Sequence, residues 1–154
     1  MPAPASELSE ADLRRKAIGL LARREHSRRE LTQKLGRGAD ADLVMSVIDA
    51  LAEEGLQSDT RCAEMIVFAR IERGHGPLRI RSDLRDVGIG SETVEHLLEA
   101  EEDHWEERLL KLVERRYRGE APADARDWSK RARFLASRGF PEGLVRRVLG
   151  DLPR

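Results

Sequence analysis

Apolar residues recur at helical spacing along most of the chain, in narrow stripes separated by charged positions. Leu13, Ala17 and Leu20, for example, follow the i, i+4, i+7 rhythm that places side chains on one side of a helix. No run of residues stands out in which apolar and polar positions alternate, as they would along a half-buried strand. The pattern therefore predicts an all-α protein.

The predicted helices fall into three sets of three, and the sets are related to one another by a spacing of about 50 residues. Matching positions are Leu35, Leu84 and Leu135 in the second helices and Val44, Val94 and Val145 in the third helices. A helical period of this length is typical of a tandem array, in which each unit buries part of its apolar face against its neighbour. We therefore expect three tandem three-helix repeats that form an elongated, curved array.

Cap and stop signals give the expected boundaries. The S-x-x-D pattern at Ser9 and the S-x-x-E pattern at Ser27 match the capping box of a helix start, and a third helix is expected to begin at Asp40 or Asp42. The expected division is a flexible N-terminus (1–8), repeat one (9–56), repeat two (57–100), repeat three (101–150) and a C-terminal tail (151–154).

The stretch from Ser58 to Ile89 carries the most distinctive pattern, which predicts a helix, a tight Gly-His-Gly-Pro corner and a second helix. Gly74 and Gly76 permit backbone angles closed to other residues, and Pro77 suits the first turn of a helix. Arginines follow both helices, and two more flank the corner of the first repeat: Arg70, Arg73, Arg79, Arg81 and Arg85, with Arg24 and Arg28. This arrangement indicates a docking surface rather than a reaction centre.

Overall charge is balanced, because 28 basic residues face 29 acidic ones and the net charge is −1. A dedicated, purely electrostatic nucleic-acid binder would usually be strongly basic, so the balance argues against that class. The arginine-rich corners nevertheless leave open a helical module that binds phosphates through local patches.

Candidate catalytic or metal-binding groups are few. The four histidines lie in separate segments, and the single Cys62 excludes an internal disulfide and is expected to be a buried apolar residue. An acidic run at 99–107 is expected to be a solvated face rather than a cation site, because it lacks the spacing of an oxygen-ligand loop. We expect no enzyme activity, no cofactor and no metal.

Nothing in the sequence predicts export or membrane insertion. The N-terminus lacks the charged start and apolar run of a signal peptide, and no apolar run approaches the roughly 18 residues of a membrane span. We expect a cytoplasmic monomer.

Three stretches of the chain resemble the RecX family, whose members act on the bacterial recombinase RecA. They are LLARREHSRRELTQKL, the segment from LAEEG to RDVGI, and RFLASRGFPEGLVRRVL. The most specific part is S-D-x-R-x-A followed by R-x-x-x-G-x-G-P-x-R-I-x-x-x-L-x-x-x-G-I, from Ser58 to Ile89, and the resemblance extends over about residues 12–150. At Cys62 this family usually carries an aromatic residue.

The resemblance implies a function and a partner. RecX proteins lie in the groove of the RecA filament on single-stranded DNA and lower its growth, ATP hydrolysis, strand exchange and co-protease activity. On that view the seven arginines named above contribute to filament contact, while end capping and a weak direct DNA contact stay open. The alternatives are a nucleic-acid-binding helical module that acts without RecA, and a helical scaffold for some other partner.

Overall fold

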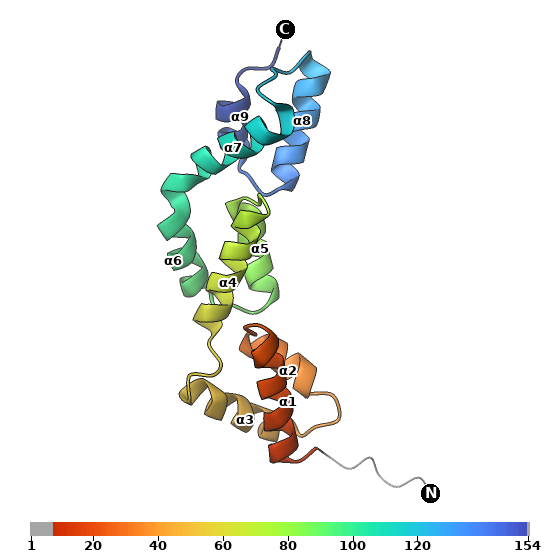
Figure 1. The fold of residues 1–154 in the computed structure, drawn as a ribbon, viewed down its shortest axis with the longest axis vertical. Coiled ribbons are helices and arrows are strands. Elements are labelled where there is room, and N and C mark those ends of the chain that lie inside the picture. The colour runs from red at the N-terminus through yellow and green to blue at the C-terminus, as the bar shows by residue number, and fades with distance from the viewer. Residues whose placement is uncertain (1–7, 154) are drawn as a thin grey trace, which may run out of the picture. The chain divides into compact units, whose positions relative to one another are not determined.

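The structure, a computed structural model, describes residues 8–153, so the expected flexible segment 1–8 lies outside the described residues except for Leu8, and so does Arg154. Regular secondary structure in the described part of the chain is entirely helical, as predicted (Figure 1). The elements are α1 (Glu10–Arg23), α2 (Arg28–Leu35), α3 (Ala41–Glu53), α4 (Asp59–Glu72), α5 (Pro77–Asp86), α6 (Ser91–Glu101), the 3-10 helix η1 (Glu102–His104), α7 (Trp105–Tyr117), α8 (Ala125–Ser137) and α9 (Glu142–Leu149).

Local signals fix the first three helix starts. Ser9 and Ser27 form complete capping boxes, in which each serine side chain accepts the backbone N–H three residues later and the acid at that position accepts the serine N–H. Asp40, rather than Asp42, caps α3 by accepting the N–H of Asp42. Both capping-box predictions are confirmed.

The helices are organised in two compact units. The N-terminal unit comprises the described residues as far as Met65 together with Asp86–Gly90, and the C-terminal unit comprises Ile66–Arg85 and the described residues from Ser91 onward. In the N-terminal unit, α1, α2 and α3 enclose one apolar core of Leu13, Ala17, Leu31, Leu35, Val44, Val47, Ile48 and Leu51. Burying each large aliphatic side chain contributes about 1.5–3 kcal/mol, so this core holds the three helices together.

In the C-terminal unit every α-helix contributes to the buried apolar interior, and the repeat predicted from the sequence is visible in it. Leu84 in α5 and Leu135 in α8 are fully buried, like their counterpart Leu35 in α2. Val94 in α6 and Val145 in α9 are buried like Val44 in α3. The matching positions in the sequence are therefore core positions.

A glycine link between helices recurs within each unit. Gly88 (φ 81°) follows α5, and a Cβ there would lie 2.8 Å from Arg29 Cβ in α2. Gly139 (φ 97°) follows α8, and a Cβ there would lie 2.5 Å from Arg79 Cβ in α5. Both links use a left-handed glycine to pass close to an arginine of the second helix of the preceding three-helix set. This close approach explains why residues 86–90 belong to the N-terminal unit.

Candidate partner-binding surface

The corner between α4 and α5, Gly74–Pro77, is fixed by backbone contacts within the C-terminal unit, and we call it the His75 corner. Gly76 N donates to the carbonyl of Arg138 at 2.7 Å, and Leu78 N donates to that of Gly139 at 2.9 Å. A Cβ on Gly76 would lie only 2.6 Å from Gly139 O, so a larger residue would push the two segments apart. The side chains that leave this corner therefore start from a rigid base.

His75 is buried at the centre of a positively charged cluster. Arg138 Nη1 lies 3.1 Å from His75 Nε2, while His75 Nδ1 has no hydrogen-bond partner among the described residues. Burial lowers the pKa of His75, and the charges of Arg79, Arg138 and Arg70 lower it further. Because a guanidinium can only donate, Nε2 accepts from Arg138 and the ring proton of the neutral imidazole lies on Nδ1.

Four of the seven predicted arginines are held by carboxylates of the same chain. The pairs are Arg24–Glu30 at 2.7 Å, Arg28–Asp49, Arg70–Asp83 at 2.7 Å and Arg81–Glu95 at 3.1 Å. Such a pair orients the guanidinium and offsets much of its charge. These four arginines consequently contribute to local structure whatever else they contact.

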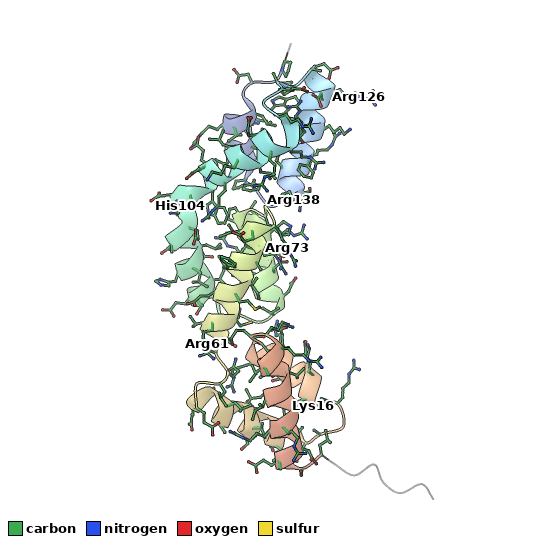
Figure 2. The ribbon with its side chains drawn as sticks, in the orientation of Figure 1. Lys16, Arg61, Arg73, His104, Arg126 and Arg138 are labelled. Carbon is green, nitrogen blue, oxygen red and sulfur yellow. The ribbon has the colours of Figure 1, made fainter. Side chains whose placement is uncertain are left out.

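The remaining three predicted arginines are exposed. No described residue forms a hydrogen bond or ion pair with the guanidinium of Arg73, at the end of α4, or with that of Arg79 in α5, and Arg85 lies on the outside of α5. Figure 2 labels Arg73 near the end of α4 and Arg138 at the end of α8. The structure thus gathers Arg70, Arg79 and Arg138 around His75, whereas Arg81 pairs with Glu95 in α6.

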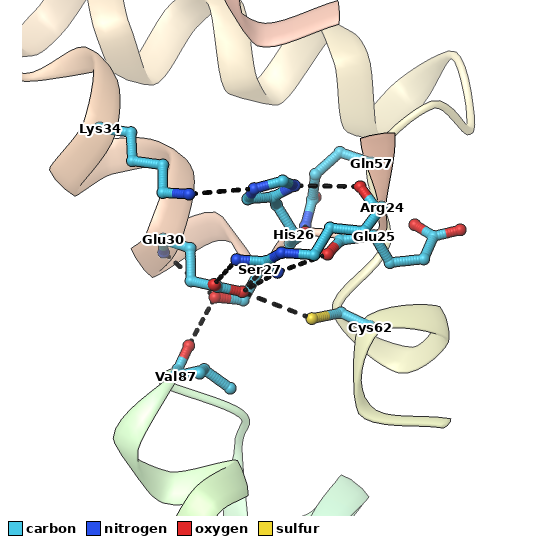
Figure 3. Close-up of polar contacts among 9 residues, drawn as sticks. All are labelled: Arg24, Glu25, His26, Ser27, Glu30, Lys34, Gln57, Cys62 and Val87. Atoms are coloured by element: carbon cyan, nitrogen blue, oxygen red, sulfur yellow. Dashed lines mark hydrogen bonds and ion pairs between the residues drawn. The ribbon is translucent and has the colours of Figure 1, made fainter. Parts of the chain in front are cut away.

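Arg24 belongs instead to a polar network in the N-terminal unit (Figure 3), the unit that also holds Arg28. Glu30 accepts hydrogen bonds from Arg24, from the N–H of Ser27 at 3.1 Å and from the Cys62 thiol at 3.6 Å. Burial would raise the pKa of Glu30, but the Arg24 and Ser27 hydrogen bonds outweigh it and the pKa is lowered. The carboxylate is therefore ionised and holds three segments together.

Cys62 and His26 are structural members of this network. Burial, followed by the neighbouring Glu30 charge, raises the pKa of the Cys62 thiol to about 12. The expected burial of Cys62 is confirmed, although its thiol also donates to Glu30. His26 is also buried, donates from Nδ1 to the carbonyl of Arg24 at 3.0 Å and accepts from Lys34 at 3.3 Å. Burial lowers the pKa of His26, so this ring too is neutral near pH 7.

Sequence reasoning did not single out Arg138, which belongs to this surface, or Phe68, an exposed aromatic residue of α4. Arg138 was not among the seven arginines, although it directly precedes the glycine link at Gly139 and contacts His75. Phe68, in α4, has 68% of its surface exposed, which is unusual for a large aromatic side chain. Its position off the helix face that carries Cys62, Ile66 and Ala69 is the signal that could have identified it.

Between residues 8 and 153, no group of three or more His, Cys, Asp or Glu side chains is placed to hold a metal ion. No helix in the same range is both long enough and apolar enough to cross a membrane. What the structure does show at the His75 corner is a backbone fixed by hydrogen bonds and surrounded by positive charge.

Comparison with known proteins identifies the family. Models of the first, second and third three-helix domains of RecX match residues 14–51, 58–98 and 102–149. Proteins named regulatory protein RecX are similar over nearly the whole chain. That of Pseudomonas syringae is 44% identical over 138 residues, which span 89% of both chains. That of Halorhodospira halophila is 46% identical over 143 residues, which span 92% of this chain and 88% of the relative.

Solved structures share the fold. RecX from Lactobacillus salivarius superposes with a TM-score of 0.75 at 20% identity, covering 91% of this chain and 94% of that one. Another crystal structure of regulatory protein RecX gives a TM-score of 0.69 at 23% identity, covering 90% of this chain and 72% of that one. The sequence matches to all three domains and the identity to its relatives show that this chain belongs to the RecX family of regulatory proteins.

Proposed function

We propose that this protein regulates the RecA recombinase by binding, as a monomer, in the groove of the RecA filament on single-stranded DNA. Binding suppresses filament growth, ATP hydrolysis, strand exchange and co-protease activity. Membership of a family of regulatory proteins supports a regulatory role. The observation that carries the proposal at the residue level is the rigid His75 corner with Arg73 and Arg79 beside it, whose guanidinium groups no described residue pairs.

The chemistry of the surface supports a partner that carries carboxylates or phosphates. A guanidinium presents donors in a planar fork that matches both groups, and a fixed backbone lowers the entropy lost on binding. Arg70 and Arg138 add to the positive potential beside the two unpaired side chains, and Arg85 extends it along α5. Arg24, Arg28 and Arg81 take part from within their ion pairs. We propose that the repeats 9–56, 57–100 and 101–150 each supply part of the contact.

The first test is RecA's single-stranded-DNA-dependent ATP hydrolysis with this protein titrated in. Loss of hydrolysis well below one protein per RecA indicates blocked filament growth, whereas loss only near equal amounts indicates saturation of the groove. Unchanged hydrolysis at every ratio, with a folded protein, contradicts the proposed function.

Charge reversal tests the residues. The double variant R73E/R79E removes the two unpaired cations of the His75 corner, and we expect inhibition of RecA to weaken about tenfold or more, as for loss of two exposed charge contacts plus new repulsion. R37E/R126E changes the net charge equally at two exposed positions outside the corner and is the matched control. Full inhibition by a folded R73E/R79E protein would show that the His75 corner is not part of the binding surface.

The alternative is a helical module that binds nucleic-acid phosphates without RecA. The unpaired guanidinium groups of Arg73 and Arg79 favour this alternative as well. It predicts tight binding to bare single-stranded DNA, with log affinity that falls by roughly 0.7 per phosphate contact for each tenfold rise in salt. Fluorescence anisotropy with a labelled oligonucleotide, with and without RecA, separates the two functions. Binding that needs RecA favours the regulator.

A further inference from the structure

A pocket of about 530 Å³ opens in the C-terminal unit. Of the seven predicted arginines, Arg81 alone lines it. Its apolar lining comes from helices distant in sequence and includes Leu78 in α5, Trp105 in α7 and Leu144 in α9. Trp105 is buried, whereas 48% of the Leu78 surface is exposed. The volume lies within the range of roughly 300–1,000 Å³ in which protein pockets hold ligands. The pocket thus offers unburied apolar surface that a ligand could cover.

The rim of the pocket is acidic. It carries five carboxylates against two guanidinium groups, an excess of three negative charges: Glu95, Glu99, Glu102, Asp103 and Glu106, with Arg81 and Arg147. Both arginines are occupied, Arg81 by Glu95 at 3.1 Å and Arg147 by Glu106 at 3.5 Å. Glu99, Glu102 and Asp103 have no ion-pair partner among the described residues.

We propose that this pocket is a docking site for a basic segment of a partner protein, in which an aliphatic side chain lies on the apolar lining and flanking Lys or Arg side chains reach the three unpaired carboxylates. Charge complementarity selects the cations, and Lys and Arg stems can themselves cover apolar surface while their charged ends stay at the rim. The proposal does not depend on the proposed function, because the segment is defined by its chemistry and not by the protein that carries it.

Two other occupants fit the pocket less well. A divalent cation would need converging carboxylates, and no group of metal-ligating side chains is placed to hold one within residues 8–153. A small polyamine would satisfy the rim, but its methylene chains would cover less of Leu78 and Leu144 than an aliphatic side chain together with Lys or Arg stems would. A segment that alternates apolar and basic side chains satisfies both parts of the pocket.

The experiment uses the full chain and three fluorescein-labelled hexapeptides: Lys-Leu-Lys-Arg-Leu-Lys, the same peptide with both leucines replaced by serine, and an acidic version, Glu-Leu-Glu-Glu-Leu-Glu. Fluorescence anisotropy at about 0.1 M salt should show binding of the first peptide, at least tenfold weaker binding of the serine peptide and none of the acidic one. The variant E99Q/E102Q/D103N should weaken binding of the first peptide about tenfold, the combined effect of three exposed charge contacts.

Controls separate the pocket from general charge. E53Q/E64Q/E120Q removes three exposed carboxylates elsewhere and should bind the peptide like the natural chain. Leu78→Ser changes a half-exposed position, so the fold should survive, and should weaken binding of the leucine peptide but not of the serine peptide. Equal binding of the leucine and serine peptides, or equal loss in both triple variants, would overturn the proposal. Displacement of the peptide by an equimolar amount of spermidine would assign the pocket to small cations instead.

Discussion

At the scale of single residues, ion pairing divides the arginines into two groups. Arg28 is engaged by Asp49 and Arg70 by Asp83, so a partner must displace or share a carboxylate to reach them. Arg73 has no such partner among the described residues, so it can meet a carboxylate or phosphate without breaking an existing contact. Exposed ion pairs are worth only about 0–1 kcal/mol, so the paired arginines are hindered rather than excluded.

The two buried histidines predict a stability that depends on pH. Burial lowers the pKa of His26 and of His75. The charges of Arg79, Arg138 and Arg70 lower the pKa of His75 further, while the charge of Asp83 opposes this shift. Unfolded histidine titrates near about 6.5, so below that pH the unfolded chain binds protons that the folded chain does not. The free energy of unfolding should therefore fall as the pH decreases from 7.5 to 5.5, by up to about 1.4 kcal/mol per pH unit for each ring.

Urea unfolding at pH 7.5, 6.5 and 5.5 measures the slope of the free energy of unfolding against pH. The variant H26N/H75Q keeps a donor in place of His26 Nδ1 and an acceptor in place of His75 Nε2, and its slope should be flatter. H96N/H104N, which changes two exposed histidines, should keep the slope of the natural chain. A slope that H26N/H75Q leaves unaltered would mean that other groups cause the pH dependence.

At the scale of helices, the two capping boxes form a matched pair for measuring how much a tertiary contact adds to the stabilisation by an N-cap serine. Ser9 caps α1 in an exposed setting, whereas Ser27 caps α2, is buried and donates from Oγ to the carbonyl of Val87 at 2.5 Å. Ser9→Ala should cost about 1 kcal/mol, the usual value of an N-cap. Ser27→Ala should cost about 2–3 kcal/mol, because it also leaves a carbonyl without its donor. Chemical denaturation of both variants checks the difference, and equal losses would show that the Val87 contact contributes nothing.

Sequence patterns were informative at this scale because caps and apolar stripes act within a few residues. The S-x-x-D and S-x-x-E patterns predicted the starts of α1 and α2, and the three matched leucines are buried. Ion pairs are different, because Asp49 lies 21 residues from Arg28 and Glu95 lies 14 residues from Arg81. No local pattern reports which carboxylate an arginine will meet, so the division between paired and unpaired arginines required the structure.

At the scale of the whole molecule, the near-zero net charge conceals a separation of charge within the C-terminal unit. The acidic run at 99–107 was expected to be a solvated face, and Glu99, Glu102 and Asp103 are indeed exposed. They also lie on the rim of a pocket, because α5 and α9 place apolar residues beside them. The same unit carries the positively charged His75 corner. Composition averages these two regions and so could not predict either.

The proposed function makes a further prediction about the intact protein, because both units carry arginines proposed to contact the filament. A filament presents the same site on successive protomers, so contacts from both units to one assembly combine by avidity. Affinity for RecA assembled on single-stranded DNA should therefore exceed affinity for RecA without DNA by about a hundredfold or more. Surface plasmon resonance with this protein immobilised measures both affinities at the same salt concentration. R37E/R126E should preserve the ratio, R73E/R79E should reduce it, and equal affinities for the two forms of RecA would rule out recognition of the assembled filament.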